Sequence, residues 1–166
     1  RKVRLAAIKA EMNWSELLFL STCNRVEFFF CGESSGTEEK LFHFFRSLYP
    51  KLPQEKIDLF VSNTLHIQGE RSMEHLLRVA SSIDSLVVGE REIITQVRNA
   101  FESSKKMNLV GDFIRLVIRQ TIETAKKVYT DTSIATKPVS VVSLAYHKLR
   151  DMNIPLDARI LIVGAG

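Results

Sequence analysis

Cys23 is the residue whose position most strongly suggests chemistry. It lies beside Arg25 in the polar stretch 22–25, between two apolar, aromatic-rich runs at 17–21 and 26–31. Runs of this composition around a tight polar segment predict a β-hairpin, whose turn would present the sulfur to a ligand. A nearby guanidinium favours the thiolate, the nucleophilic form of cysteine. The pattern predicts a nucleophile at position 23; the alternative is a turn cysteine with no chemical task.

The second cysteine, Cys31, follows three phenylalanines and is expected to be buried as a small apolar side chain. The spacing of the two cysteines matches no metal motif and no dithiol redox motif, and two are too few for a disulfide scaffold. A reducing, intracellular setting is therefore expected. No apolar run approaches the roughly 20 residues that cross a bilayer, so no membrane partner is predicted.

The charge balance is mildly basic, with a net charge of +4. This suits a polyanionic partner such as RNA but does not by itself assign one. Several basic residues are spread over two expected helices: Arg98, Lys105, Lys106, Arg115, Arg119, Lys126 and Lys127. Such charges usually form a solvated helix face; contact with RNA phosphates is the alternative interpretation.

The periodicity of apolar residues predicts the elements that would position the turn. A helix within 1–18 precedes the first strand, and a helix opened by a capping box at 35–38 follows the second and ends at Pro50. Alternating apolar residues predict a half-buried strand over 59–67, before a helix that carries His75. Allowing for a missing first strand, this order predicts an α+β fold with a ferredoxin-like split βαβ layer.

A helical section follows Gly89, with one helix capped at Asp112 and another opened by Pro138. A β-branched strand then runs into Gly-x-Gly, at Gly164 and Gly166, as at the opening of a dinucleotide-binding Rossmann unit. The sequence includes no third glycine and no ribose-binding acid, so this fingerprint is incomplete.

A second group of polar candidates lies between 75 and 90. A lone helical histidine such as His75 is more often a surface residue than a catalytic base. Asp84, Ser85 and Glu90 occupy a mixed segment that fits either an active-site loop or an ordinary helix end.

These two regions together resemble the glutamyl-tRNA reductase family. The stretch 20–27 (Leu-Ser-Thr-Cys-Asn-Arg-Val-Glu) is similar to the family signature Ser-Thr-Cys-Asn-Arg-Thr-Glu. Residues 75–81 and 84–90, continued by 96–98, are similar to the second diagnostic block of the family. The blocks and the Gly-x-Gly strand follow one another in the family's order and cover nearly the whole chain.

The resemblance implies a catalytic, glutamyl-tRNA-binding domain over 1–136, a helical linker over 137–157, and the first strand of a truncated NADPH-binding Rossmann domain over 158–166. It implies a homodimer for the full-length protein, glutamyl-tRNA(Glu) as substrate and NADPH as cofactor. Glutamate-1-semialdehyde aminomutase is a further partner that it suggests, for handover of the product. The expected location is the cytoplasm, or a plastid if a transit segment has been removed.

The implied reaction is NADPH-dependent reduction of glutamyl-tRNA to glutamate-1-semialdehyde through a thioester on Cys23, the first committed step of tetrapyrrole biosynthesis. Arg25 would bind a substrate carboxylate, and His75 would polarise the substrate or handle a proton. The other residues expected to bind the substrate are Thr22, Asn24, Ser85, Glu90 and Gln96. Gly164 and Gly166 would contact the cofactor.

The sequence departs from the family pattern at a few positions. Val26 replaces a threonine, Ser82 and Thr95 replace glycines, and Arg-Glu replaces Pro-Gln at 91–92. Because glycine reaches conformations that serine avoids, the loop around Ser82 could differ in freedom. The changes at Ser82 and Thr95 give modest support to a rival hypothesis, a non-catalytic tRNA-binding or regulatory homologue. A second rival, an unrelated thiol dehydrogenase, would act on free aldehydes without tRNA.

Overall fold

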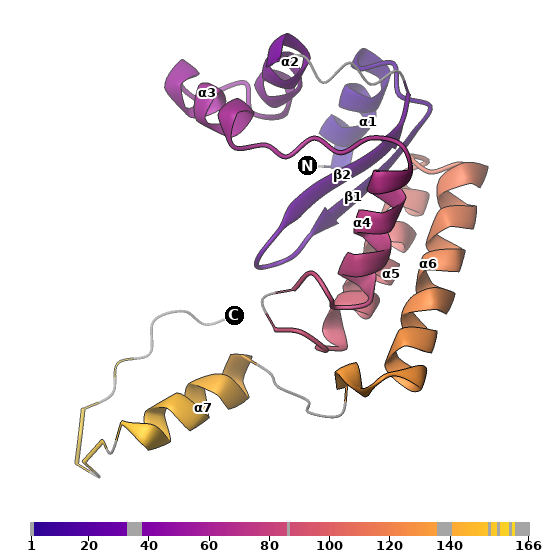
Figure 1. Ribbon diagram of the computed structural model, residues 1–166. Helices are drawn as coiled ribbons and strands as arrows, with labels where there is room; N and C mark the ends of the chain where they lie inside the picture. Colours follow the sequence, from indigo (N-terminus) through magenta and orange to yellow (C-terminus); the bar gives the residue numbers. More distant parts are fainter. Residues whose placement is uncertain are drawn as a thin grey trace.

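Seven α-helices and a two-stranded antiparallel sheet make up the described part of the chain in a computed structural model (Figure 1). The structure describes residues 2–32, 38–85, 87–135, 141–152, 154–155, 157–159 and 161. Its elements are α1 (Lys2–Glu11), β1 (Glu16–Ser21), β2 (Val26–Cys31), α2 (Glu38–Leu48), α3 (Gln54–Ser62), α4 (Glu70–Ala80), α5 (Glu92–Lys106), α6 (Asp112–Asp131), the 3-10 helix η1 (Ser133–Ala135) and α7 (Val141–Asp151).

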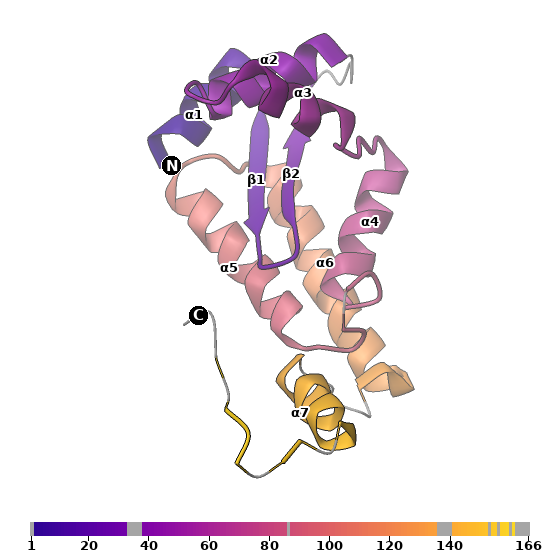
Figure 2. The ribbon, with the colours of Figure 1, turned by 90° about the vertical axis from the view of Figure 1, so that its left-hand side faces the viewer.

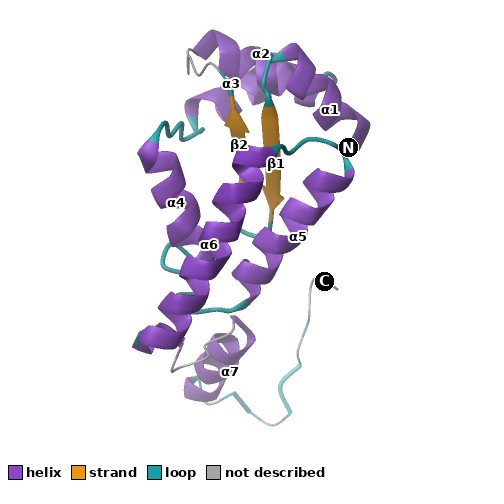
Figure 3. Cartoon of the chain, turned by 90° about the vertical axis from the view of Figure 1, so that its right-hand side faces the viewer, coloured by secondary structure: helices purple, strands orange, loops and turns teal. Residues whose placement is uncertain are grey.

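The β1–β2 hairpin is the centre of the fold, and the predicted hairpin is confirmed. Its register pairs Glu16 with Cys31 at the open end and Ser21 with Val26 next to the turn. Helices α1, α2 and α3 gather over the open end, whereas α4, α5 and α6 run alongside the strands towards the turn (Figure 2). From the opposite side, α6 crosses in front of the hairpin with α4 and α5 on either side (Figure 3).

Each face of the hairpin packs into its own apolar cluster, because successive side chains of a strand point to opposite faces. Leu18 and Leu20 join buried residues of α4, α5 and α6, with Phe29 packed against them. Leu17 joins Leu5 and other apolar residues of α1 and α2 on the opposite face. The hairpin is therefore covered on both sides, which fixes the direction in which its turn projects.

The predicted strand over 59–67 is wrong. Residues 54–62 form helix α3, and residues 64–68 have no regular structure. Pro53 begins this helix instead of only ending the previous one, and Ile57 is fully buried one turn later. A short apolar run fits the spacing of a strand as well as that of a helix. Here the residues form a helix, and Leu65, which the strand would have buried, is 77% exposed. The ferredoxin-like layer that relied on this strand is not confirmed.

The cap expected at Asp112 is also wrong, because a residue far away in the sequence caps this helix. Gly111 is the N-cap of α6, and no side-chain cap bond is formed by it. Glu16 of β1 instead accepts hydrogen bonds from the backbone N–H groups of Gly111 (2.9 Å), Phe113 (3.1 Å) and Ile114 (2.8 Å). A carboxylate is favoured at a helix N-terminus by its free N–H groups and its dipole.

Three other predicted features fall partly or wholly outside the described residues. The capping box at 35–38 and the helix start at Pro138 lie there, although α2 and α7 follow close behind them. In the segment 158–166, the described residues Ala158, Arg159 and Leu161 belong to no strand, and the two glycines lie outside the described part.

Candidate active site

The turn that carries Cys23 is closed by Thr22. Its backbone N–H donates to the carbonyl of Arg25 (2.9 Å), and its hydroxyl oxygen accepts from the N–H groups of Asn24 and Arg25, each at 3.2 Å. A threonine hydroxyl that binds nearby backbone in this way stabilises a tight turn without help from glycine. Thr22 thus has a structural task in addition to the substrate contact predicted for it.

Cys23 and Cys31 differ in exposure as the sequence predicted. Cys23 is exposed on the turn, whereas Cys31 is half-buried in the open end of the hairpin. Burial, with the nearby Glu16 carboxylate as a second cause, raises the pKa of the Cys31 thiol to about 11. Cys23 is therefore the more accessible of the two cysteines.

Arg25 joins the turn to helix α4 through Glu27. The Arg25 Nη1 donates to Glu27 Oε1 at 2.9 Å, and His75 Nε2 lies 3.1 Å from the same oxygen. All three side chains are largely shielded, with exposures of 18%, 24% and 26%. Glu27 lies two residues before Phe29 on β2 and so points to the face that packs on α4, α5 and α6. The structure therefore brings Arg25 and His75 together, as their assignment to one site requires.

Asp84 completes this arrangement from the loop after α4. Its carbonyl oxygen accepts a hydrogen bond from Arg25 Nη2, and its Oδ2 lies 3.6 Å from His75 Nδ1. The imidazole therefore lies between two carboxylates, one in hydrogen-bond contact and one slightly beyond it.

The loop that follows α4 is held in shape by Ser82 and Tyr129. Ser82 is fully buried with a φ of 57°, its carbonyl accepts from the N–H of Gly89 (3.2 Å), and its hydroxyl donates to the carbonyl of Val87 (3.1 Å). Tyr129 of α6 donates its hydroxyl to the carbonyl of Glu90 (2.9 Å). Burial raises the pKa of this phenol, opposed by its contacts with Ser82 and Arg91.

Two of the replaced glycines can now be interpreted. The left-handed φ of Ser82 is one that glycine adopts without strain, so the serine keeps a glycine-like backbone and adds a hydroxyl contact. Thr95 lies on an exposed side of α5, where an ordinary helical conformation suffices. Neither replacement disturbs the contacts of Arg25 or His75.

The remaining predicted residues are more scattered. Ser85 is half-buried next to Asp84, and Glu90 contributes a carbonyl to Tyr129. Gln96 is half-buried on α5. Sequence reasoning missed the linking role of Glu27; the available signal was a charged residue whose alternation with Phe29 places it on the packed face of the strand.

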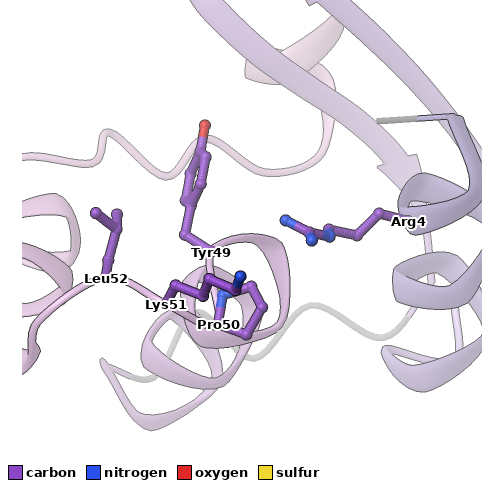
Figure 4. A pocket seen from close by; sticks show the side chains of 5 residues that line it. All are labelled: Arg4, Tyr49, Pro50, Lys51 and Leu52. Carbon is purple, nitrogen blue, oxygen red and sulfur yellow. The ribbon is translucent and has the colours of Figure 1, made fainter.

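Two hollows of the described chain lie away from the turn. One, of ≈ 260 Å³, is lined by Arg4, Tyr49, Pro50, Lys51 and Leu52, with Arg4 reaching across from α1 (Figure 4). The other lies between α2 and α3 and is lined by residues such as Phe42 and Asp58. Both belong to the open end of the hairpin, and neither contains a residue of the 22–25 turn. Cys23 itself is exposed on the turn.

Two further properties concern only the described residues. They contain no group of three or more His, Cys, Asp and Glu side chains arranged to hold a metal ion. None of their helices combines the length and apolar character of a membrane span.

Comparison with known proteins gives one consistent result. The sequence model of the family described as "Glutamyl-tRNAGlu reductase, N-terminal domain" matches residues 2–132. Proteins named glutamyl-tRNA reductase from Idiomarina loihiensis and Aquifex aeolicus are each 32% identical over 166 residues, which is 98% of this chain but 37% and 39% of theirs. One from Chromohalobacter salexigens is 34% identical over 98% of the chain. The chain thus spans somewhat more than a third of the length of these relatives.

Proposed function

We propose that this chain, which belongs to the glutamyl-tRNA reductase family, takes glutamate from glutamyl-tRNA as a thioester on Cys23 and presents it for reduction to glutamate-1-semialdehyde. The observation that carries the proposal is an exposed cysteine on a turn that Arg25, Glu27 and His75 hold against α4. Because the relatives are much longer than this chain, the complete activity is proposed for the full-length protein.

The first step would be attack of the Cys23 thiolate on the ester carbonyl that joins glutamate to the terminal ribose. The new C–S bond forms as the C–O bond breaks, and the ribose oxygen leaves with a proton. A thiolate suits this task because it is nucleophilic near neutral pH. The exposure of the turn allows the end of a folded RNA to approach the sulfur.

Arg25 would bind a carboxylate of the glutamyl group. Two of its N–H groups already bind Glu27 and the carbonyl of Asp84, which hold the guanidinium in place. A guanidinium has five N–H donors, so others remain to pair with the substrate. Thr22, Asn24, Ser85, Glu90 and Gln96 are the further substrate contacts that we propose.

His75 would handle the proton of the acylation step. Its ring would accept the thiol proton of Cys23 and return it to the departing ribose oxygen, so that no proton is gained or lost overall. The carboxylates of Glu27 and Asp84 flank the ring and would stabilise its charged form between these two transfers.

NADPH would supply the hydride that reduces the thioester carbonyl. Arg25, Glu27, His75 and Asp84 contact one another in the described site, so we assign no described residue to the cofactor. The residues proposed for that role, Gly164 and Gly166, lie outside the described part of the chain. The Rossmann strand and the domain limits stay predictions. So do the homodimer, the aminomutase partner and the cytoplasmic location.

The test is single-turnover transfer of labelled glutamate from glutamyl-tRNA to the full-length protein without NADPH. We expect acid-stable, thiol-labile label on the native protein and on Cys31→Ser, and none on Cys23→Ser. Label of that kind on Cys23→Ser would refute the assignment of the nucleophile. Absence of label from the native protein, with tRNA still bound, would instead support the non-catalytic tRNA-binding homologue.

A further inference from the structure

We propose that Glu27 is a positioning residue that determines which ring nitrogen of His75 carries hydrogen. By this assignment Nε2 carries the hydrogen, and Nδ1 is the nitrogen that exchanges protons at the site. The inference deepens the proposed function and rests on it for its catalytic part, whereas its structural part can be tested separately.

Arg25 and His75 share one carboxylate oxygen of Glu27. Glu27 Oε1 accepts from Arg25 Nη1 at 2.9 Å and lies 3.1 Å from His75 Nε2. With 24% of its side chain exposed, Glu27 lies between the turn and α4 and touches both. A single carboxylate oxygen therefore connects the guanidinium beside Cys23 to the imidazole.

The chemistry of the three groups determines the direction of the two hydrogen bonds. Arginine can only donate, and an ionised glutamate can only accept. His75 Nε2 must therefore be the donor in its contact with Glu27, which fixes the Nε2–H tautomer whenever the ring is neutral. The remaining lone pair is on Nδ1, so this atom alone can accept a proton.

Other charged groups lie near the His75 ring but make no short contact with it. Asp84 Oδ2 lies 3.6 Å from Nδ1, beyond hydrogen-bond distance, and its side chain is 51% exposed. On α4 itself, Glu74 pairs with Arg78 at 3.9 Å in an exposed position. Glu27 therefore makes the only short ring contact that the described residues show, and Asp84 can respond when Nδ1 gains a proton.

A measurement of the tautomer tests the structural part. In the full-length protein, nitrogen chemical shifts of labelled histidine, assigned by comparison with His75→Asn, should show mainly the Nε2–H form of neutral His75. In Glu27→Ala the acceptor of the Nε2 hydrogen is gone, and the carboxylate that remains near the ring is that of Asp84, beside Nδ1, so the hydrogen should move to Nδ1. Mainly Nδ1–H in the native protein, or no change in Glu27→Ala, would overturn the inference.

The rate of acylation tests the catalytic part. Glu27→Ala should lower the single-turnover rate roughly 10- to 100-fold, within the usual contribution of general acid–base catalysis, with tRNA affinity nearly unchanged. Glu27→Asp keeps the carboxylate and should recover part of the rate. Glu74→Ala, which removes the same side chain from an exposed position on α4, is the matched control and should have no effect.

The two measurements separate the possible failures. A native protein that shows the Nε2–H form but forms no thioester would refute the proposed function and leave the structural role of Glu27 standing. A thioester formed at the native rate by Glu27→Ala would refute the positioning role and leave Cys23 as the nucleophile.

Discussion

The two ends of the hairpin contain the same pair of residue types in opposite circumstances. At the open end, Glu16 is the register partner of Cys31. Near the turn, Glu27 contacts Arg25, two residues from Cys23. Glu16 binds three backbone N–H groups of α6, which cannot leave without unfolding the helix. Glu27 binds only side chains, which a substrate can rearrange. The partners, and not the residue types, make one end structural and the other suited to chemistry.

The cysteines provide the most sensitive test of this difference. At pH 8, a thiol whose pKa is about 11 holds ~100-fold less thiolate than one with the ordinary value of 9.0, so Cys31 should react with a thiol reagent far more slowly than the exposed Cys23. Peptide mapping by mass spectrometry after timed alkylation measures both rates in one sample. Equal rates would show that Cys31, at the open end of the hairpin, is as accessible to the reagent as Cys23.

The same shift predicts how stability depends on pH. The pKa of Cys31 is raised from 9.0 to about 11 in the fold, so the folded state holds the thiol proton more tightly than the unfolded one. Its stabilising contribution is complete below pH 9 and is lost as pH rises from about 9 to 11. Cys31→Ala should remove this part of the alkaline dependence, as measured by urea unfolding at several pH values.

The glutamates should separate stability from activity. Glu16→Ala leaves three backbone N–H groups at the start of α6 without their acceptor and should lower the free energy of unfolding by about 2–3 kcal/mol. Glu27→Ala removes partly exposed ion pairs and should cost about 1 kcal/mol or less. Trp14, the single tryptophan of the sequence, stacks on Phe30 and reports unfolding by fluorescence.

Equal losses of unfolding free energy in Glu16→Ala and Glu27→Ala would contradict the proposed difference between the two ends of the hairpin. The matched test is activity: Glu16→Ala, at a temperature where it stays folded, should acylate at nearly the native rate, because none of its contacts lies at the turn.

Gly111 offers a finer test of the open end. A Cβ added there would lie 2.6 Å from Oε1 and 2.8 Å from Cδ of Glu16, so the carboxylate would have to move from its N–H donors. Gly111→Ala should therefore lower the free energy of unfolding by about 1–2 kcal/mol. In a Glu16→Ala background the same change should cost much less, since the obstructing side chain is gone. Additive effects in the double variant would show that the two residues do not interact.

What could be predicted from the sequence was local. The hairpin and the turn that carries Cys23 follow from two apolar runs around four polar residues, and α4, α5 and α6 follow from helical periodicity. The error over 59–67 arose where a few apolar residues fit both periodicities and Pro53 opened a helix. The cap of α6 by Glu16 and the link from Glu27 to His75 could not be predicted, because they join residues 95 to 98 and 48 positions apart.

The smallest effect on stability is expected at Ser82, in the loop after α4 that contacts Arg25 through Asp84. Its φ of 57° costs a non-glycine residue about 1 kcal/mol, and its hydroxyl returns a similar amount through Val87. Ser82→Gly removes both terms and should change the free energy of unfolding by less than about 1 kcal/mol. Ser82→Ala keeps the strain and loses the hydrogen bond, so it should be about 1 kcal/mol less stable than native in urea unfolding. Equal stability of Ser82→Ala and Ser82→Gly would contradict this account, because it would show that the left-handed backbone at position 82 does not need a glycine. The loop that holds Asp84 near His75 would then depend on other contacts.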